Sequence, residues 1–278
     1  MSLLRRGLGL RREHAKQLCQ RGNMPGVDFL EVVPDNWMGL GGQSAETLQT
    51  LAGHYPMVAH GLSLSIGDAQ DIDWGYLRRV REFLDAYRID VYSDHLSASR
   101  DDQGYMYELV PVPRSAASAR HIADKVRRVQ EYLGRRLSLE NVSSYYRDPH
   151  EMAEGEFIAM ILQMSGCALL LDINNVYVNS INFNEDPNAF LQCIPEDAVS
   201  YYHIAGHAES AGCMPLLDTH GSDVCEEVVD LGKSVVARFG MRPLVLERDN
   251  NVPPLPALCD ELQRIYASLL QQEGSGSR

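Results

Sequence analysis

The 278-residue sequence predicts an α/β fold, specifically a single-domain (β/α)8 barrel, or TIM barrel. Two observations predict it: eight short runs rich in Val, Leu and Ile have the length of buried strands, and segments with helical periodicity lie between them. The runs span residues 5–11, 28–33, 57–66, 89–96, 135–142, 168–178, 199–207 and 243–249. Eight parallel strands covered by helices close a barrel. A doubly wound open sheet is the alternative architecture.

Three of the intervening segments have clear helical patterns, with apolar residues at three- and four-residue spacing: residues 73–87, 114–134 and 225–240. The last two end at Gly134 and Gly240, and glycine is the residue that most often ends a helix in a left-handed conformation. Strand and helix alternate to the end of the chain. We therefore expect parallel strands whose following loops build the active site at one face of the barrel.

No linker rich in Pro, Gly or Ser divides the chain, and no internal repeat is visible. We expect one catalytic domain over residues 1–270. The final residues 271–278, QQEGSGSR, are expected to be a tail that is disordered or carried over from cloning. The segments at 39–44 and 97–113 are expected to line the barrel mouth and set specificity, unless they are plain surface loops.

The composition excludes several classes of function. Lys and Arg number 25 against 38 Asp and Glu, and the net charge of −13 disfavours nucleic acid as the main ligand. The six cysteines have no CxxC spacing, so free thiols in a reducing cytoplasm are expected rather than disulfides. The sequence has neither a secretory signal nor a membrane-spanning apolar run, so no membrane partner is expected.

Side chains that bind metals follow most of the apolar runs. Those at or just beyond the end of a run are His60, His95, Glu140, Asp172, His203 and Glu247, and a loop after the seventh run adds Asp218 and His220. Because the carboxyl ends of parallel strands meet at one face, these four imidazoles and four carboxylates are expected to converge. They exceed what one divalent ion can coordinate, so two or three metal ions bridged by carboxylates are expected.

A lone His or Asp at a strand end is more often a hydrogen-bonded structural residue or a helix N-cap than a ligand. The convergence of many such residues changes this interpretation. Each unpaired charge in a crowded site destabilises the fold by roughly several kcal/mol unless a metal or counter-ion neutralises it. Imidazole and carboxylate ligands without thiolate suit Fe, Mn or Zn and disfavour Cu(I), Fe–S clusters and structural zinc. These ligand types do not distinguish iron from zinc.

Several motifs, in order along the chain, resemble those of a known family. They are GLGLR near the start, HGLSLSIG (60–67), SDHLS (93–97), LENVSSYY (139–146), LLLDINNVYVNSIN (169–182), HIAGH (203–207), DTHG (218–221) and LERDN (246–250). With them the sequence resembles the multinuclear non-heme iron-dependent oxidative enzymes, which include the methanobactin-biosynthesis oxidase and the enzyme of thiaglutamate biosynthesis.

This resemblance implies a xylose isomerase-like TIM barrel that holds two or three Fe(II)/Fe(III) ions. It also implies that O2 is the co-substrate, and that the enzyme oxidatively modifies a cysteine, or another residue, of a ribosomally synthesised precursor peptide. A small partner protein that binds the leader peptide is expected to deliver this substrate.

The resemblance also implies roles for individual residues. Carried over by motif, the metal ligands are His60, His95, Glu140, Asp172, Asn175, His203, Asp218, His220 and Glu247. Asp249 matches an acidic residue that transfers protons, and its spacing from Glu247 puts both on one strand face. The alternative role for Asp249 is an ion pair with Arg248. His207 is expected beside the ligands rather than among them, and Glu31 is expected to be a mouth residue or salt-bridge partner rather than a ligand.

Two other functions remain open. A multinuclear Zn or Mn hydrolase or isomerase is possible, since barrels of the apurinic endonuclease and xylose isomerase kind use similar mouths of His and carboxylate residues. The acidic charge counts against the nuclease version. A non-catalytic metal-storage or docking protein is the third possibility. The identity of the metal separates the first two, and O2 consumption would exclude the third.

Overall fold

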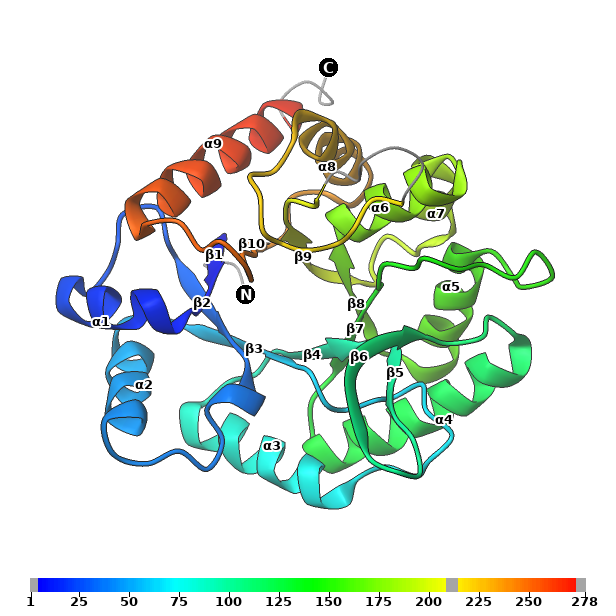
Figure 1. The fold of residues 1–278 in the computed structure, drawn as a ribbon, viewed down its shortest axis with the longest axis horizontal. Helices are drawn as coiled ribbons and strands as arrows, with labels where there is room; N and C mark the ends of the chain where they lie inside the picture. The colour runs from blue at the N-terminus through cyan, green and yellow to red at the C-terminus, as the bar shows by residue number, and fades with distance from the viewer. Residues whose placement is uncertain (1–4, 209–214, 274–278) are drawn as a thin grey trace.

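The computed structural model describes residues 5–208 and 215–273, which form a closed barrel of parallel strands surrounded by helices (Figure 1). Around the ring the strands are β1 (Arg6–Gly9), β2 (Phe29–Val32), β3 (Met57–Gly61), β4 (Tyr92–His95), β7 (Leu137–Glu140), β8 (Ala168–Asp172), β9 (Val199–Ile204) and β10 (Leu244–Leu246). Each predicted run supplies one of them. The pairing of β1 with β10 closes the ring, so the predicted barrel is confirmed and the open sheet is excluded.

Every second side chain of a strand points into the barrel, because strand side chains alternate between the two faces. One buried apolar cluster consists of Phe29, Val58, Leu170, Tyr201 and Val245. Two positions further along the same runs stand Glu31, His60, Asp172, His203 and Glu247. An apolar layer therefore lies directly beneath a polar layer at the C-terminal end of the barrel.

Helices cover the outside of the ring (Figure 1). They are α1 (Arg12–Arg21), α2 (Gly42–His54), α3 (Trp74–Tyr87), α4 (Ala116–Leu133), α5 (Glu154–Ser165), α6 (Ile173–Phe183), α7 (Pro187–Cys193), α8 (Glu226–Phe239) and α9 (Leu255–Glu273), with a short 3-10 helix η1 (Pro34–Asn36). The three helices predicted from periodicity are α3, α4 and α8. Gly134 and Gly240 end α4 and α8 with positive φ, as expected. The main core lies between these helices and the strands.

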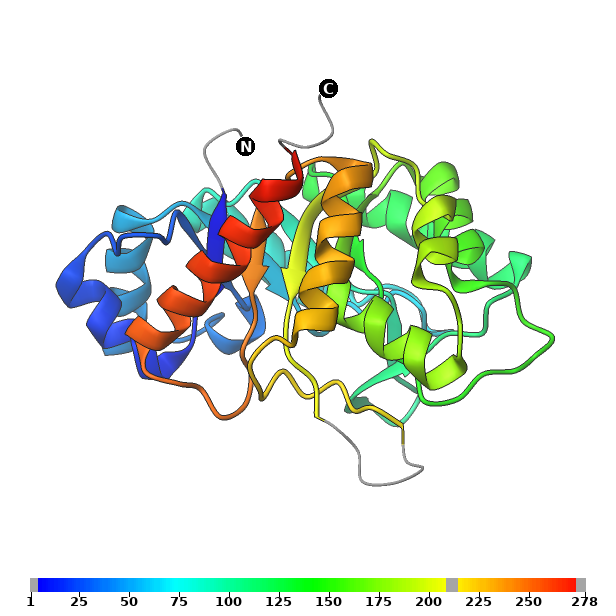
Figure 2. The same cartoon turned by 90° about the horizontal axis from the view of Figure 1, so that it is seen from above.

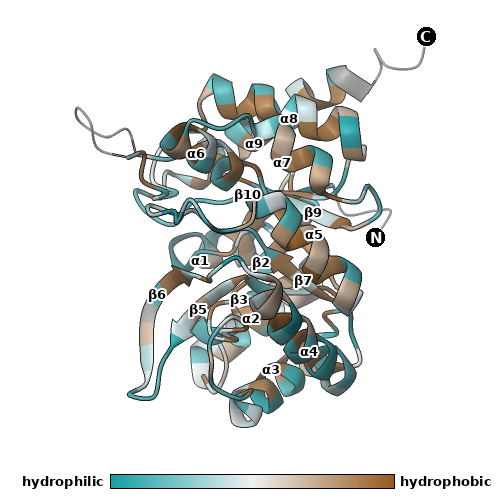
Figure 3. Ribbon diagram, turned by 90° about the vertical axis from the view of Figure 1, so that its right-hand side faces the viewer, coloured by the Kyte–Doolittle hydropathy of each residue, from teal (hydrophilic) through white to brown (hydrophobic). Residues whose placement is uncertain are grey.

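An antiparallel hairpin interrupts the alternation after β4. It consists of β5 (Ser97–Arg100) and β6 (Tyr105–Pro111), which pair only with each other among the described residues. The hairpin projects from the barrel (Figure 3), and it lies on the same face as the segment after β9 (Figure 2). The segment predicted as a mouth loop at 97–113 therefore has regular structure.

Two predicted strands are wrong in their second halves. The run at 57–66 ends as a strand at Gly61. The run at 168–178 ends as a strand at Asp172, and α6 begins at the next residue. The Asp172 carboxylate accepts a hydrogen bond from the backbone N–H of Asn175 at 2.6 Å, which caps the new helix. Apolar residues on both sides of the two asparagines imitate a continuous strand, but those after the asparagines are buried on a helix face instead.

Other sequence predictions concern the ends of the chain and its thiols. Helix α9 continues to Glu273, and residues 274–278 of the predicted tail lie outside the described part. The free cysteines in the described part are Cys19, Cys167, Cys193, Cys225 and Cys259, whereas Cys213 lies outside it. Among the described helices, none is both long enough and apolar enough to cross a membrane.

Candidate metal centre

The residues predicted to bind metal converge inside the C-terminal end of the barrel. The buried ones are His60, His95, Glu140, Asp172, Asn175, His203, His220 and Glu247. Asp218 is only partly buried, and the side chain of Asp249, which is 40% exposed, lies at the rim. Alternation places the strand residues there, and the β9–α8 connection adds Asp218 and His220 from above.

The first cluster of donor atoms joins β3, β4 and β7. The Nε2 atom of His60 lies 3.1 Å from Glu140 Oε2 and 3.2 Å from His95 Nε2. His95 Nε2 is 3.6 Å from the same Glu140 oxygen. One donor atom from each residue lies within 4.8 Å of the other two, so the three side chains could share one metal ion.

The second cluster centres on His203 of β9. Its Nδ1 atom is 3.7 Å from Glu140 Oε1, 4.0 Å from Asp172 Oδ2 and 3.0 Å from Glu247 Oε2. Glu140 thus belongs to the first and the second cluster with different oxygen atoms. A carboxylate shared in this way is the group that bridges neighbouring ions in multinuclear sites.

The third cluster lies above β8 and β10. His220 Nδ1 is 3.3 Å from Glu247 Oε2, and Asp172 completes a group whose donor atoms lie within 4.8 Å of one another. His220 Nε2 is 2.7 Å from Asp218 Oδ1. The backbone of His220 is left-handed, with φ of 47°, a conformation that non-glycine residues seldom adopt outside turns and functional sites.

Asp249 pairs with Arg11 rather than with its neighbour Arg248. Arg11, in the loop after β1, donates to Asp249 and lies 3.4 Å from Glu247 Oε1. Arg248 turns away and binds Asp223 at 2.8 Å and Glu261 at 2.7 Å. The alternative ion pair considered for Asp249 is therefore wrong. Arg11 is a site residue that the sequence did not reveal, although it follows a strand run just as the ligands do.

Several donor atoms in this site make no hydrogen bond among the described residues, although they are buried. They are His95 Nδ1, Glu140 Oε2, Asp172 Oδ2, Asn175 Oδ1, His203 Nδ1 and both ring nitrogens of His220. Each buried polar atom without a partner costs about 1–3 kcal/mol of folding free energy. A group of this size in one place therefore needs an explanation other than ordinary packing. Glu140 Oε2, His203 Nδ1 and the two His220 nitrogens lie 2.7–3.3 Å from oppositely charged donor atoms without the geometry of a hydrogen bond, which fits metal ions bound between them.

The pKa values of the buried His and Asp side chains in this site are shifted strongly, some upwards and some downwards. Burial disfavours the charged form of His60, but Glu140 and Glu31 outweigh it and raise the pKa of His60 to about 9. Burial lowers the pKa of His95 to about 4. Burial and the charge of Glu140 raise the pKa of Asp172 to about 8. Groups that compete for protons in this way are characteristic of a functional site.

A buried network beneath the clusters fixes two of the imidazoles. Glu31 accepts from the Tyr201 hydroxyl at 2.8 Å, and its carboxylate lies 2.8 Å from His203 Nε2. Tyr201 also contacts Ser93 Oγ at 2.6 Å, and Ser93 lies 2.8 Å from His60 Nδ1. Glu31 therefore holds the Nε2 side of His203, and the ring presents Nδ1 to the second cluster. Glu31 lies inside the barrel rather than at its mouth, where it pairs with His203. With His203 and Glu247 it also forms a group whose donor atoms lie within 4.8 Å of one another.

His207 lies on the outer side of the third cluster. Its Nδ1 atom is 2.9 Å from Asn174 Oδ1, and Asn174 in turn donates to Asp218 at 2.8 Å. The hydroxyl of Ser143 donates to the second oxygen of Asp218 at 3.3 Å. His207 and Ser143 thus orient Asp218, directly or through Asn174, without reaching the buried donors.

A hollow of about 660 Å³ opens above the clusters to the barrel mouth. We call it the metal pocket. Besides the predicted ligands other than Asp172 and His203, its lining includes Arg11 and Asp249, Ser143, and Tyr105, Glu108 and Leu109 of the hairpin. The segment at 97–113 therefore lines the mouth, whereas the segment at 39–44 is absent from this wall. The volume is large enough to admit part of a peptide.

Residues 5–270 match the protein family described as "RiPP precursor modification enzyme MbnB/TglH/ChrH". The chain is also similar to curated proteins named UPF0276. It is 44% identical to the one from Shewanella oneidensis, with 94% of this chain and 92% of that protein covered. It is 42% identical to the one from Acinetobacter baylyi, with 97% and 92% covered.

Solved structures with low sequence identity share the fold. A D-tagatose 3-epimerase-like protein has a TM-score of 0.62 at 12% identity, covering 99% of this chain and 100% of that one. Endonuclease IV from Thermus thermophilus has a TM-score of 0.58 at 14% identity, covering 96% and 99%. A xylose isomerase-like TIM barrel protein from Mycobacterium smegmatis, solved with magnesium, has a TM-score of 0.58 at 14% identity, covering 93% and 88%. The predicted xylose isomerase-like TIM barrel is therefore confirmed.

Proposed function

Because the chain belongs to the family of RiPP precursor modification enzymes MbnB/TglH/ChrH, we propose that it oxidises a residue of a ribosomally synthesised precursor peptide at a multinuclear iron centre, with O2 as co-substrate. Cysteine is the residue we expect it to modify. The observation that carries the proposal is the convergence of buried imidazole and carboxylate donors that lack hydrogen bonds. Cytoplasmic location and a small partner protein that binds the leader peptide are parts of the same proposal.

Three groups of side chains would hold two or three iron ions. His60, His95 and Glu140 form the first group, and Glu140, Asp172 and His203 the second. The third group contains Asp172, His220 and Glu247, with Asp218 and the Asn175 oxygen beside it. Bound iron supplies the redox chemistry and the Lewis acidity that these side chains lack.

The protein's own contribution is position and protonation. Glu31 and Ser93 fix which nitrogen of His203 and of His60 faces the clusters, and the apolar layer below excludes water from that side. Asp249 lies at the boundary between the buried donors and the open pocket, with Oδ2 3.4 Å from His220 Nδ1. From there its carboxylate can take up or release a proton at the peptide, while Arg11 holds it in place.

The alternative function is a multinuclear Zn or Mn hydrolase or isomerase. The donor set suits those metals as well, and the fold is shared with endonuclease IV and with epimerases. A net charge of −13 disfavours a nucleic-acid substrate for this chain. Metal identity and O2 uptake separate this alternative from the oxidative proposal.

The first test is metal analysis and Mössbauer spectroscopy of the anaerobically purified protein. It is followed by O2 exposure with a cysteine-containing precursor peptide encoded beside the gene. We expect two or three irons per chain, O2 uptake that requires the peptide, and a mass change in the peptide. Stoichiometric zinc, together with an inert iron-loaded protein, would contradict the proposal and favour the hydrolase.

A matched pair of variants connects this activity to the site. Glu140→Gln removes the carboxylate shared by the first and second clusters and should lose bound iron together with O2 uptake. Glu156→Gln makes the same change at an exposed position of α5 and should alter neither.

A further inference from the structure

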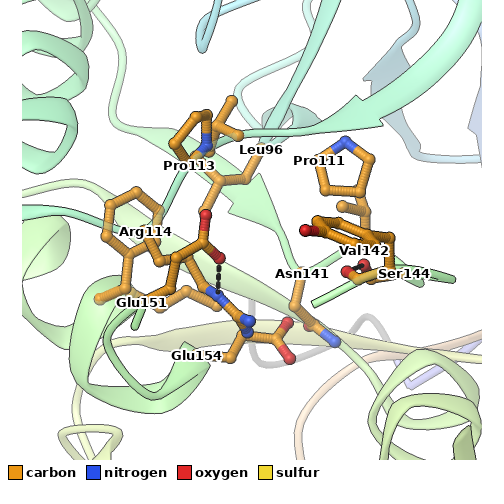
Figure 4. A pocket seen from close by; sticks show the side chains of 13 residues that line it. Leu96, Pro111, Pro113, Arg114, Asn141, Val142, Ser144, Glu151 and Glu154 are labelled. Carbon is orange, nitrogen blue, oxygen red and sulfur yellow. Dashed lines mark hydrogen bonds and ion pairs between the residues drawn. The ribbon is translucent and has the colours of Figure 1, made fainter. Parts of the chain in front are cut away.

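We propose that a second hollow, beside the metal pocket, binds a large uncharged apolar side chain of the substrate peptide, close in sequence to the residue that enters the metal pocket. The inference rests on the proposed peptide-modifying function and names a specificity site for it. We call this hollow the side pocket (Figure 4). Its apolar lining consists of Leu96, Pro111, Val112, Val142, Phe157 and Ile158.

The hairpin strand β6 and the residues after it form one wall common to both hollows. Tyr105 and Leu109 of β6 line the metal pocket. Further along the same segment, Pro111 and Arg114 line the side pocket. A peptide that follows this segment therefore passes from one hollow to the other.

The loop after β7 forms the second common wall. Val142 lines both hollows, and the next two residues divide between them: Ser143 lines the metal pocket and Ser144 the side pocket. Successive residues of an extended peptide point to opposite sides, so neighbouring side chains can enter different hollows across so thin a wall. This continuity with the metal pocket is the reason for assigning the peptide as the occupant.

Hydrogen bonds from α6 hold the dividing wall in place. Asn179 accepts from the Ser144 backbone N–H at 2.8 Å and donates to the Val142 carbonyl at 3.1 Å. The same Asn179 amide donates to the carboxylate of Glu154 at 3.0 Å, at the start of α5. The side pocket is therefore preformed, which reduces the entropy lost when a side chain binds there.

The size of the side pocket suits a large side chain. Its volume is about 210 Å³. A dry cavity of about 150 Å³ lined by aliphatic and aromatic side chains binds benzene, so a phenyl or a large aliphatic group fits this one. Apolar groups also gain most from entering a pocket with this lining.

The charges at the polar end disfavour acidic side chains. Arg114 Nε donates to Glu151 at 3.2 Å, so the guanidinium already has an acidic partner (Figure 4). Glu154 lies near this pair, and its burial raises the pKa of its carboxyl group to about 7. No positive charge is left in excess, so an incoming carboxylate would lose hydration without gaining a matched partner.

Methyl-resolved NMR of the full-length protein, with diamagnetic zinc in place of iron, tests the side pocket directly. The probes are the amides of N-acetyl-phenylalanine, N-acetyl-alanine and N-acetyl-glutamate. We expect the phenylalanine probe to shift the methyl signals of Leu96, Val112, Val142 and Ile158, with an affinity at least about tenfold above that of the other two probes. Absent shifts, or equal binding of the glutamate probe, would overturn the proposal.

Two variants show whether the shifts come from this site. Ser144→Phe places a ring at the side-pocket wall and should abolish them, whereas Thr50→Phe adds the same ring to an exposed position of α2 and should leave them unchanged. Persistence of the shifts in folded Ser144→Phe contradicts the assignment. If the peptide is modified, exchanging its apolar flanking residue for Glu should raise KM at least about tenfold in the wild type but not in Ser144→Phe.

The two proposals fail in different ways. If the side pocket binds the phenylalanine probe but no peptide is oxidised, the oxidative function is wrong and the pocket remains. If a peptide is oxidised but neither the methyl shifts nor the KM effect appears, the side pocket is wrong and the function remains.

Discussion

Glu31 supports the candidate metal site from beneath by holding one ring nitrogen of His203. Its buried carboxylate lies 2.8 Å from His203 Nε2, so the other ring nitrogen faces the second cluster. Outer carboxylates of this kind typically change metal affinity about 10–100-fold when they are mutated. A glutamine at this position loses the charge and can donate instead of accept, which destabilises the required tautomer.

We therefore expect Glu31→Gln to bind iron about 10–100-fold more weakly while the protein remains folded. Iron retained after dialysis against graded chelator measures the effect, and Mössbauer spectra should change for the ions that remain. Glu156→Gln is the surface control. Unchanged retention in Glu31→Gln would show that Glu31 supports only the apolar layer around it.

Asp249 is the residue whose predicted role differs from that of the ligands. It is partly exposed and paired with Arg11 at the pocket rim, and it belongs to none of the four groups of donor atoms that could hold an ion in the described part of the chain. We expect Asp249→Asn to lower kcat by about 10²–10⁴-fold, in the range of a lost general acid or base, with iron content unchanged. Peptide turnover and metal analysis on one preparation measure both.

The exposed Asp223, which pairs with Arg248, supplies the control Asp223→Asn. If Asp249→Asn lost an iron ion, Asp249 would be a ligand and its assigned role would be wrong.

Among individual residues, the sequence reveals the candidate metal ligands but not the side chains that hydrogen-bond to them. His60 and Glu140 stand at the ends of apolar runs, so the rules of parallel barrels place them together. The hydrogen bonds of Ser93 and Tyr201 depend on which strands become neighbours across the barrel interior, and periodicity along one strand carries no such information. The contact of Arg11 with Asp249 likewise depends on the pairing of β1 with β10, which closes the barrel.

Helix α6 shows that one residue can serve two elements. Asp172 ends β8, belongs to two of the donor clusters, and caps α6 through the backbone N–H of Asn175. Asparagine caps helices about as well as aspartate but carries no charge. Exchange between these two residues therefore separates capping from metal binding.

We expect Asp172→Asn to lose bound iron. At neutral pH its metal-free form should be at least as stable as the metal-free wild type, because folding no longer has to protonate or bury a carboxyl group whose pKa is raised to about 8. Asp172→Ala removes the cap as well and should cost about 1 kcal/mol of metal-free stability relative to Asp172→Asn. Urea unfolding of chelated proteins measures both. Equal stability of the two variants would mean that the cap contributes nothing.

The elements that the sequence misassigns have a common physical cause. Continuous apolar runs predict the barrel strands, which are buried on both faces, and periodicity predicts the helices α3, α4 and α8, each of which buries one apolar face. Strand β5 buries serines rather than apolar residues, and in β6 the exposed Met106 and Val110 do not alternate with polar residues in a regular way. The start of α6 depends on one side-chain hydrogen bond, which no periodicity reports.

For the whole molecule, metal binding and folding should be coupled. Buried carboxylates and imidazoles without hydrogen bonds destabilise the metal-free barrel, and a ligand that binds only the folded state stabilises it by mass action. The stabilisation is about 2.7 kcal/mol when the free metal is at 100 times its Kd. We expect a clear rise in Tm on anaerobic iron loading.

Calorimetry of chelated and iron-loaded protein measures this difference, and Glu140→Gln should reduce it. A Tm independent of metal would mean that the buried donors are satisfied without ions.

Arg11 follows the first strand of the barrel, and Glu247 and Asp249 follow the last one, so their contacts lie where β1 and β10 meet. During synthesis the N-terminal part of a chain leaves the ribosome first. Glu247 follows β10, the last strand of the ring, so the other seven strands are made before the donor set is complete. The third cluster, which needs Glu247, therefore cannot form until the strand that closes the barrel has been made.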